Sequence, residues 1–409
     1  MLEVGISIAD ITPKEPKYMC GYVMRTEKSK GIDEDLTVTA LTIRVDGQML
    51  IMISAEIIII DQEMSQTVRG LLSKKYVIPE KMISIGAVHT HSAPVVNTAI
   101  DSEEKLDKEY RQYVINQMVK AAEDSINNLN VVNHTVYRYG WIDGVYGNRN
   151  DKSIDGDKWV HIIDFKQNNR LLASIVNFSC HGTVLGPDNY ILSADLPGEI
   201  RRRLKDMYGV LPIILNGNSG DMGNRQYRQG NDIKELKRVG SEICDQIFAF
   251  NREKEININE LKFEEVKQGI KYKIDKDQLK ALIDENELKL EKEDNYDKRK
   301  LLKSGLAFMK ERMTRKSLDV NIDITSLIYK LGDLAIVTIP GELFSKLGLK
   351  LKGRSDYKPT LIFGYANDFN GGYLVSESDY GDSYESITTE IPRGKPEELV
   401  AEISKHLKK

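Results

Sequence analysis

The stretch IMISAEIIII, residues 51–60, decides the fold class of this chain. It is apolar almost throughout, which is typical of a strand buried on both faces of a sheet. A helical pattern follows over residues 61–76, and a second apolar run covers residues 82–88. This alternation of strand, helix and strand predicts an α/β domain with layered mixed sheets flanked by helices. Glu56 interrupts the first apolar run, and a buried carboxylate needs a partner or a function.

Two histidines, His89 and His91, follow the second apolar run in the motif GAVHTHSAP at residues 86–94. Near the end of a strand, this spacing sends both side chains to the same face. Neutral imidazole is the commonest metal ligand in proteins, so the pair can begin a metal site. The pair by itself fits half-buried packing without a metal equally well.

The composition predicts a protein that builds its own hydrophobic core. The chain has 409 residues, of which 41% are hydrophobic, and its formal net charge of −4 gives no reason to expect nucleic acid or an anionic membrane as partner. No window approaches the roughly 20 apolar residues of a membrane span. The three cysteines lack the spacing of a thiolate zinc site or a disulfide framework. With no secretory signal at the N-terminus, we expect a cytoplasmic protein, with a homo-oligomer as a possible assembly.

Other polar residues also stand beside predicted strands. His181 follows an apolar strand predicted over residues 171–178, and Glu342 follows strand-like residues 321–339 and is predicted to open a helix. The loop at residues 216–225 is rich in glycine and asparagine, which exposes backbone N–H groups suited to an oxyanion, although a plain solvent loop is the alternative. Histidines and a carboxylate in such positions are suitable ligands for zinc.

A change of composition marks residues 257–320. Within this range, residues 276–315 are dense in Lys, Glu and Leu and contain no proline. This pattern predicts a charged helical insertion, in the form of an exposed hairpin or lid, within one catalytic domain spanning residues 1–409. We expect its charges to form a solvated face rather than a binding patch.

Taken in order, several short motifs resemble those of the N-terminal catalytic domain of the neutral/alkaline non-lysosomal ceramidase family. The resemblance rests on the order of the motifs rather than on any one of them, and it spans most of the chain. The motifs are Ala9-Asp10-Ile11-Thr12, His89-Thr90-His91-Ser92-Ala93-Pro94, Asn148-Arg149, His181-Gly182-Thr183, Asn218-Ser219-Gly220-Asp221, Pro340-Gly341-Glu342 and the tyrosine-rich run at 373–385.

The resemblance implies one zinc ion per chain and hydrolysis of the amide of an N-acyl sphingoid base by metal-activated water. The implied metal ligands are His89, His181, Glu342 and Tyr373. His91 would then act as an acid/base or stabilise the oxyanion.

The resemblance also implies residues on the substrate side of the site. Arg149 and Tyr384 would hold the oxyanion or the substrate carbonyl, and Tyr380 would contact the substrate. Asp221 would brace the glycine-rich loop, and Gly223 would line the site.

The chain departs from the family pattern at Gly223, where the family motif Gly-Asp-x-Ser-Pro-Asn has its serine. A serine nucleophile is therefore disfavoured, whereas metal-activated water needs no serine. The chain also ends soon after the tyrosine-rich run, without the C-terminal β-sandwich of longer members. We expect a zinc-dependent hydrolase of an amide or similar acyl bond, with a small polar or singly acylated substrate rather than ceramide. A metal-dependent isomerase or lyase, and a non-catalytic metal- or ligand-binding relative, are the alternatives.

Overall fold

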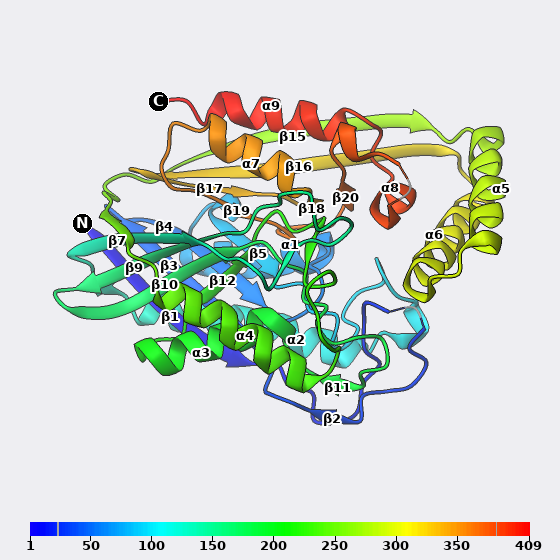
Figure 1. The fold of residues 1–409 in the computed structure, drawn as a ribbon. Helices are drawn as coiled ribbons and strands as arrows, with labels where there is room; N and C mark the ends of the chain where they lie inside the picture. The colour runs from blue at the N-terminus through cyan, green and yellow to red at the C-terminus, as the bar shows by residue number, and fades with distance from the viewer. Residues whose placement is uncertain (23, 382) are drawn as a thin grey trace.

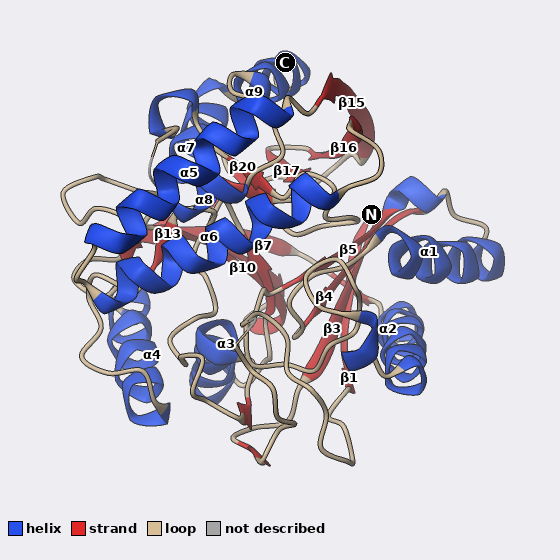
Figure 2. Ribbon diagram, turned by 90° about the vertical axis from the view of Figure 1, so that its right-hand side faces the viewer, coloured by secondary structure: helices blue, strands red, loops and turns tan. Residues whose placement is uncertain are grey.

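Three mixed β-sheets form the centre of the structure, a computed structural model that describes residues 1–22, 24–381 and 383–409. The first sheet contains β1 (Leu2–Asp10), β3 (Thr37–Val45), β4 (Gln48–Ala55), β5 (Ile83–Ala87) and β6 (Asn130–Val131), in the order β5-β4-β3-β1-β6. Strands β4 and β5 are parallel, and helix α1 (Gln62–Tyr76) connects them. The long helix α2 (Lys108–Asn127) packs beside α1 over β1 and β3 (Figure 2).

The second sheet contains β7 (His134–Trp141), β9 (Trp159–Gln167), β10 (Arg170–Phe178), β12 (Ile213–Asn216) and β14 (Arg252–Glu255), in the order β12-β10-β9-β7-β14. Its parallel pair is β10 and β12, and helix α3 (Asp195–Tyr208) lies between them in the chain. Helix α4 (Ile233–Phe248) packs against α3 on the outside of the molecule (Figure 1).

The third sheet contains β15 (Lys262–Lys273), β16 (Asp319–Leu331), β17 (Leu334–Thr338) and β19 (Thr360–Phe363), in the order β15-β16-β17-β19. Strands β17 and β19 are parallel, with helix α7 (Ser345–Arg354) between them and α9 (Lys395–His406) packed on α7. The smaller elements are β2 (Gly31–Ile32) with β11 (Ile191–Leu192), β8 (Gly147–Asn148) with β13 (Met222–Gly223), β18 (Glu342–Leu343) with β20 (Tyr373–Leu374), the short helix α8 (Tyr384–Thr388), and 3-10 turns at Glu80–Met82, Glu103–Lys105 and Glu377–Asp379.

Each large sheet therefore contains one parallel pair, and the carboxyl ends of the three pairs meet. Asn216, at the end of β12, donates from Nδ2 to the carbonyl oxygen of Val88, just after β5, over 2.9 Å. Its own carbonyl oxygen accepts from the N–H of Gly364, just after β19, over 2.8 Å. In α/β proteins, sites form at the carboxyl ends of parallel strands, because the following loops can converge there. The layered α/β fold predicted from the sequence is confirmed.

The predicted buried strand over residues 51–60 is shorter in the structure. Strand β4 ends at Ala55, and residues 57–60 stay fully buried without pairing in the sheet. Glu56 is also buried, and its carboxylate pairs with the guanidinium of Arg201 at 2.8 Å and accepts from the N–H of Thr37 at 2.7 Å. The predicted partner of this carboxylate is thus an arginine on α3.

A helical hairpin of α5 (Lys276–Lys292) and α6 (Tyr296–Thr314) connects β15 to β16 and stands at one edge of the molecule (Figure 1). It matches the charged segment at residues 276–315. The earlier part of the range 257–320 contains β15 instead of helix, because Val266 and Ile270 alternate with exposed residues along an antiparallel pairing with β16. Among the described residues, no helix is long and apolar enough to cross a bilayer.

Candidate metal centre

His89 lies just beyond β5 and is turned toward the interior by its backbone. Its φ of 66° is in the left-handed region, and its N–H donates to the carbonyl oxygen of Ile57 over 3.1 Å. The strand has already ended at Ala87, so the alternation of side chains along a strand does not place His89 and His91 on one face, and that expectation is wrong. The two imidazoles nevertheless meet, with 3.2 Å between their Nε2 atoms.

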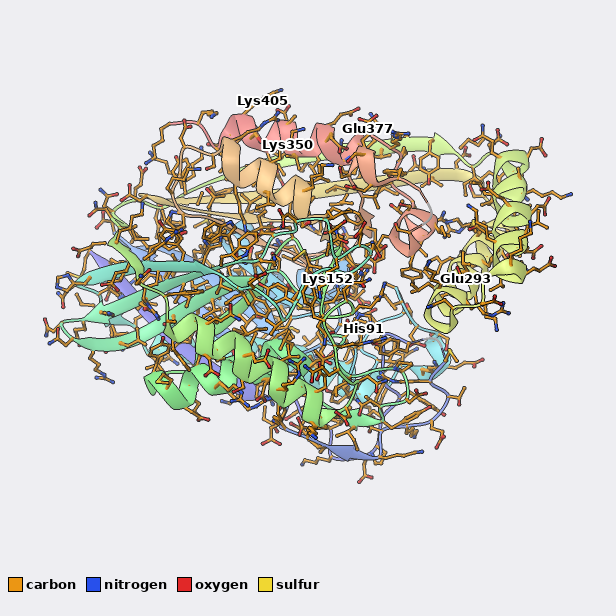
Figure 3. All side chains as sticks on the ribbon, viewed as in Figure 1. His91, Lys152, Glu293, Lys350, Glu377 and Lys405 are labelled. Atoms are coloured by element: carbon orange, nitrogen blue, oxygen red, sulfur yellow. The ribbon has the colours of Figure 1, made fainter. Side chains whose placement is uncertain are left out.

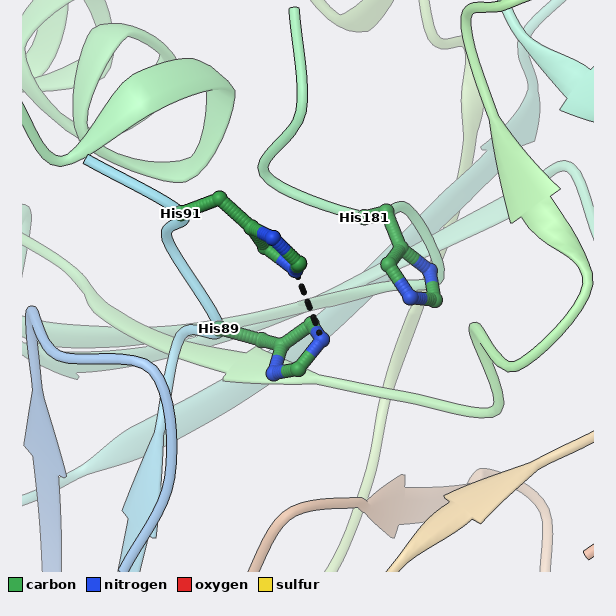
Figure 4. A group of neighbouring side chains, drawn as sticks. All are labelled: His89, His91 and His181. Atoms are coloured by element: carbon green, nitrogen blue, oxygen red, sulfur yellow. Dashed lines mark hydrogen bonds between the residues drawn. The ribbon is translucent and has the colours of Figure 1, made fainter. Parts of the chain in front are cut away.

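A third imidazole, that of His181, completes the group (Figure 4). One ring nitrogen from each of the three histidines lies within 4.8 Å of the others. The segments that carry them are joined directly, because the N–H of His91 donates to the carbonyl oxygen of Gly182 over 3.0 Å. His89 and His181 are buried, and His91 is partly exposed.

The outer ring nitrogens show which tautomer each imidazole adopts. Nδ1 lies 2.8 Å from the carbonyl oxygen of Ile58 in His89, 3.0 Å from that of Gly21 in His91, and 2.7 Å from that of Ser219 in His181. A carbonyl oxygen can only accept, so Nδ1 carries the hydrogen in each ring and Nε2 keeps its lone pair. This is the usual support of a metal-binding histidine. Burial lowers the pKa of all three imidazoles well below 6.5, so they are neutral at pH 7.

Glu342 places a carboxylate beside these lone pairs. Its Oε2 lies 2.9 Å from Nε2 of His181 and 3.5 Å from Nε2 of His89. Nε2 of His181 is buried and makes no hydrogen bond within the described part of the chain. Lone pairs that face a carboxylate with no hydrogen between them repel one another, and a cation among them removes this repulsion. The group can therefore hold a metal ion, and its imidazole and carboxylate donors suit zinc.

The local structure at Glu342 differs from the sequence-based expectation. Glu342 lies in β18, which pairs in parallel with Tyr373 and Leu374 of β20, and helix α7 begins only at Ser345. The carboxylate of Glu342 is therefore positioned by a short strand and not by the first turn of a helix. Burial raises the pKa of the Glu342 carboxyl group.

A second group of side chains surrounds Arg149. Its guanidinium pairs with the fully buried carboxylate of Glu385 at 2.6 Å, and its Nη2 donates to the hydroxyl of Tyr373 over 3.0 Å. The ring of Tyr373 is parallel to that of His181, with 6.5 Å between centroids, and its other neighbour is the ring of Tyr384 at 6.1 Å. Burial raises the pKa of Tyr373, and raises that of Tyr384 to about 12.

Asp221 and Gly223 lie close to Arg149. The Asp221 carboxylate accepts from the N–H of Ser345 at 2.6 Å, from the Ser345 hydroxyl at 2.7 Å and from Nδ2 of Asn148 at 2.9 Å. These bonds tie the glycine-rich loop to the start of α7. A Cβ added at Gly223 would lie 3.6 Å from Cβ of Arg149, which is ordinary contact, so the backbone there accepts a residue with a Cβ.

The structure places Tyr380 outside these groups. Its hydroxyl donates to the carbonyl oxygen of Ile391, and its ring packs against the apolar cluster formed by the third sheet, α7 and α9. No contact of Tyr380 with the histidines or with Arg149 is found among the described residues, and its contact with substrate stays a prediction. Asp382, in the same tyrosine-rich run, lies outside the described residues.

Three residues that touch the site were given no role in the prediction from the sequence. Glu385 holds Arg149, and Tyr365 stacks on His89 with 4.1 Å between ring centroids. Gly21 has a φ of 96°, and a Cβ there would lie 2.5 Å from Nδ1 of His91. No local pattern marks these positions, because each matters only through a neighbour that is distant in the chain.

Comparisons with known proteins agree with this architecture. Residues 2–202 match the family model described as neutral/alkaline non-lysosomal ceramidase, N-terminal. The solved structure of neutral ceramidase from Pseudomonas aeruginosa is similar, with a TM-score of 0.77 and 17% identity over 100% of this chain and 75% of that chain. A structure described as ceramidase complexed with C2 has a TM-score of 0.74 and 16% identity, over 100% of this chain and 76% of that chain. No curated protein sequence matches.

The fold is thus the layered α/β fold of the ceramidases. Residues 2–202 belong to the neutral/alkaline non-lysosomal ceramidase family, as its N-terminal domain.

Proposed function

We propose that this protein is a zinc-dependent hydrolase that cleaves an amide or similar acyl bond with metal-activated water. The observation that carries the proposal is the set of three imidazoles whose Nδ1 atoms donate to backbone carbonyls, while Nε2 of His89 and His181 face Oε2 of Glu342. Such a site is preorganised for a cation before any cation arrives.

His89, His181 and Glu342 would hold the zinc ion, with the Tyr373 hydroxyl as a further ligand. When bound, zinc lowers the pKa of a water molecule to about 7 and polarises a carbonyl group. His91 is the most accessible of the three histidines, and its Nε2 carries a free lone pair. This atom would accept a proton from the attacking water and pass it to the leaving nitrogen.

Arg149 and Tyr384 would stabilise the negative charge that develops on the substrate carbonyl oxygen. Glu385 fixes the Arg149 guanidinium, which therefore needs no reorganisation during the reaction. Burial opposes ionisation of Glu385, but Arg149 beside it lowers the pKa of this carboxyl group, so the ion pair is charged at pH 7.

The substrate would be a small polar or singly acylated molecule rather than ceramide. The guanidinium of Arg225 is half-buried near Arg149 and Glu385, and it has no hydrogen-bond or ion-pair partner among the residues described. A polar group of the substrate can supply that partner. The buried apolar residues of the α5–α6 hairpin pack on one another rather than toward the histidines.

The proposal is tested by metal analysis combined with isotope labelling. We expect one zinc per purified chain, and incorporation of one oxygen from ¹⁸O-labelled water into the carboxylate product of a short N-acyl substrate. His91→Ala should retain zinc and lose activity by about 10²- to 10⁴-fold. The matched control is His134→Ala, because His134 is exposed on the second sheet and its ring pairs with Glu255.

Two outcomes would contradict the proposal. Protein that neither contains zinc nor can be reconstituted with it has no metal centre of this kind. Turnover without incorporation of labelled oxygen would favour an isomerase or lyase, because only hydrolysis consumes water.

A further inference from the structure

Tyr365 is a fully buried residue that contacts two of the proposed zinc ligands at once. Its ring stacks on the imidazole of His89, with 4.1 Å between centroids and 19° between planes. Its hydroxyl lies 3.3 Å from Oε2 of Glu342, the same oxygen that faces the histidine Nε2 atoms. One side chain thus touches both a nitrogen ligand and an oxygen ligand.

The hydroxyl belongs to a chain of hydrogen bonds with one direction. The Glu342 carboxylate can only accept, so the Tyr365 hydroxyl donates to it. The hydroxyl of Ser219 lies 2.7 Å from that of Tyr365 and must therefore be the donor between them. The carbonyl oxygen of Ser219 in turn accepts from Nδ1 of His181. These hydrogen bonds connect Tyr365 to Glu342 and, through Ser219, to His181, while the ring of Tyr365 contacts His89.

The backbone of Tyr365 is fixed by the same segments. Its φ of 52° is in the left-handed region, which is unfavourable for a residue with a Cβ and persists only where the surroundings impose it. Its N–H donates to the carbonyl oxygen of Gly341, next to Glu342, over 3.2 Å. Its carbonyl oxygen accepts from the N–H of Ala87, at the end of β5, over 3.3 Å.

We propose that Tyr365 is a positioning residue of the metal centre, whose hydroxyl orients the Glu342 carboxylate and whose ring orients the His89 imidazole for binding a divalent cation. This inference rests on the proposed function, because it assumes that His89 and Glu342 bind zinc. Tyr365 donates to the carboxylate and does not touch the substrate. Residues that orient metal ligands in this way change metal affinity by about 10- to 100-fold when they are replaced.

The test compares Tyr365→Phe with Tyr329→Phe. Phenylalanine at 365 keeps the stacked ring and removes only the hydroxyl. Tyr329 is an equally buried tyrosine whose hydroxyl lies 2.7 Å from that of Ser84 and donates to the carbonyl oxygen of Lys81, away from the histidines. We expect Tyr365→Phe to raise the zinc dissociation constant by about tenfold or more, measured by competition with a chromogenic chelator, and Tyr329→Phe to leave it unchanged.

Two further measurements separate positioning from general stability. The visible absorption bands of the cobalt(II)-substituted protein should shift in Tyr365→Phe and not in Tyr329→Phe, because these bands report ligand geometry. Ser219→Ala, which keeps the carbonyl oxygen used by His181, should weaken zinc binding in the same direction by a smaller factor.

The results distinguish this inference from the proposed function. Equal zinc affinity in the wild type and both phenylalanine variants would overturn the role of Tyr365 and leave the metal centre in place. An equal loss in both variants would overturn it too, because the loss would then follow from removing any buried hydroxyl. Wild-type protein that binds no zinc would overturn the proposed function, and this inference with it.

Discussion

The two halves of the candidate site are held in different ways. His89, His91 and His181 are oriented by carbonyl oxygens of the main chain at strand ends. Arg149, on the substrate side, is oriented by the buried carboxylate of Glu385, and its guanidinium donates to the hydroxyl of Tyr373, where the two halves touch. A main-chain support moves only if the sheets move, whereas a side-chain support can be removed by one substitution. The metal half should therefore tolerate changes that disable the substrate half.

The substrate half also depends on the charged hairpin. Tyr384 and Glu385 lie on α8, which packs against α6 through Ile387 (Figure 1). The guanidinium of Arg312 on α6 donates to the carbonyl oxygens of Thr388 and Thr389 at the end of α8. Most charged side chains of the hairpin that the structure describes are exposed, whereas Glu293 at its tip (labelled in Figure 3) is half-buried and accepts from the N–H of Asn295. Its inner side nevertheless supports residues beside the site.

The largest effect is expected from Glu342→Gln, which removes the charge of the metal half without changing its shape. Zinc affinity should fall by more than about 100-fold, because a charged ligand is lost. The metal-free variant should be no less stable than metal-free wild type. Burial raises the pKa of Glu342, so the folded wild type binds a proton more tightly than the unfolded chain and loses stability as pH rises above 4.5.

This stability difference is measured by urea unfolding of both metal-free proteins between pH 4 and pH 8. The free energy of unfolding of Glu342→Gln, relative to that of the wild type, should increase with pH. An advantage that shrinks with pH, or unchanged zinc affinity, would show that Glu342 is not a buried metal ligand.

The next largest effect is expected from Arg149→Ala, which breaks the substrate half. It leaves the Glu385 carboxylate buried without its partner, so the free energy of unfolding should fall by about 3–5 kcal/mol. Activity should fall by about 10²- to 10³-fold while zinc remains bound. The double variant Arg149→Met with Glu385→Gln should recover stability without recovering activity. Loss of zinc in the folded single variant would contradict the division into two halves.

A smaller effect is expected from Arg312→Ala, which tests the contact of the hairpin with α8. The variant loses the hydrogen bonds from Arg312 to two carbonyl oxygens at the end of α8, which together contribute about 1 kcal/mol to holding α8 in place. We therefore expect kcat/KM to fall by about fivefold. The matched control is Arg315→Ala, because Arg315 also pairs with Glu390 but has no bond to Thr388 or Thr389 in the described structure. Equal kinetics for both variants would contradict a role of the hairpin in supporting the site.

The smallest effect is expected from Gly223→Ser. The added Cβ meets only ordinary contacts with Arg149, so stability should change by less than about 0.5 kcal/mol. Because metal-activated water needs no serine, kcat should change by less than about threefold. A gain of tenfold or more, together with a covalent acyl-enzyme detected by mass spectrometry, would show that a serine nucleophile can work at this position.

Much of the fold could be predicted from the sequence, because hydrophobic periodicity is local. Helix α1 begins where Asp61 accepts from the N–H of Met64, and its bounds follow the predicted pattern closely. The end of β4 at Ala55 could not be predicted from hydrophobicity, because Ile57 to Ile60 are as apolar as the strand itself. These residues lie outside the sheet, where Ile57 and Ile58 accept hydrogen bonds from His89, a residue 31 positions beyond Ile58.

The candidate site was predictable only as a set of residues. His89, His181 and Glu342 stand in recognisable motifs, and the structure brings them together, while their roles as ligands stay predictions. The position of Tyr380 was not predictable, since a tyrosine in a turn-rich run can face the site or the core with the same local sequence. Glu385 and Tyr365 gave no signal, because their importance depends on Arg149 and Glu342.

The sequence by itself determined the alternation of strands and helices and the chemistry available at their ends, because both depend on neighbouring residues. Only the tertiary structure decided that the ends of β5, β10, β17 and β19 meet, and that main-chain carbonyl oxygens turn three Nε2 lone pairs inward. The physical reason is that convergence depends on how three sheets pack on a shared core, and this packing brings together residues as distant in the chain as His89 and Glu342.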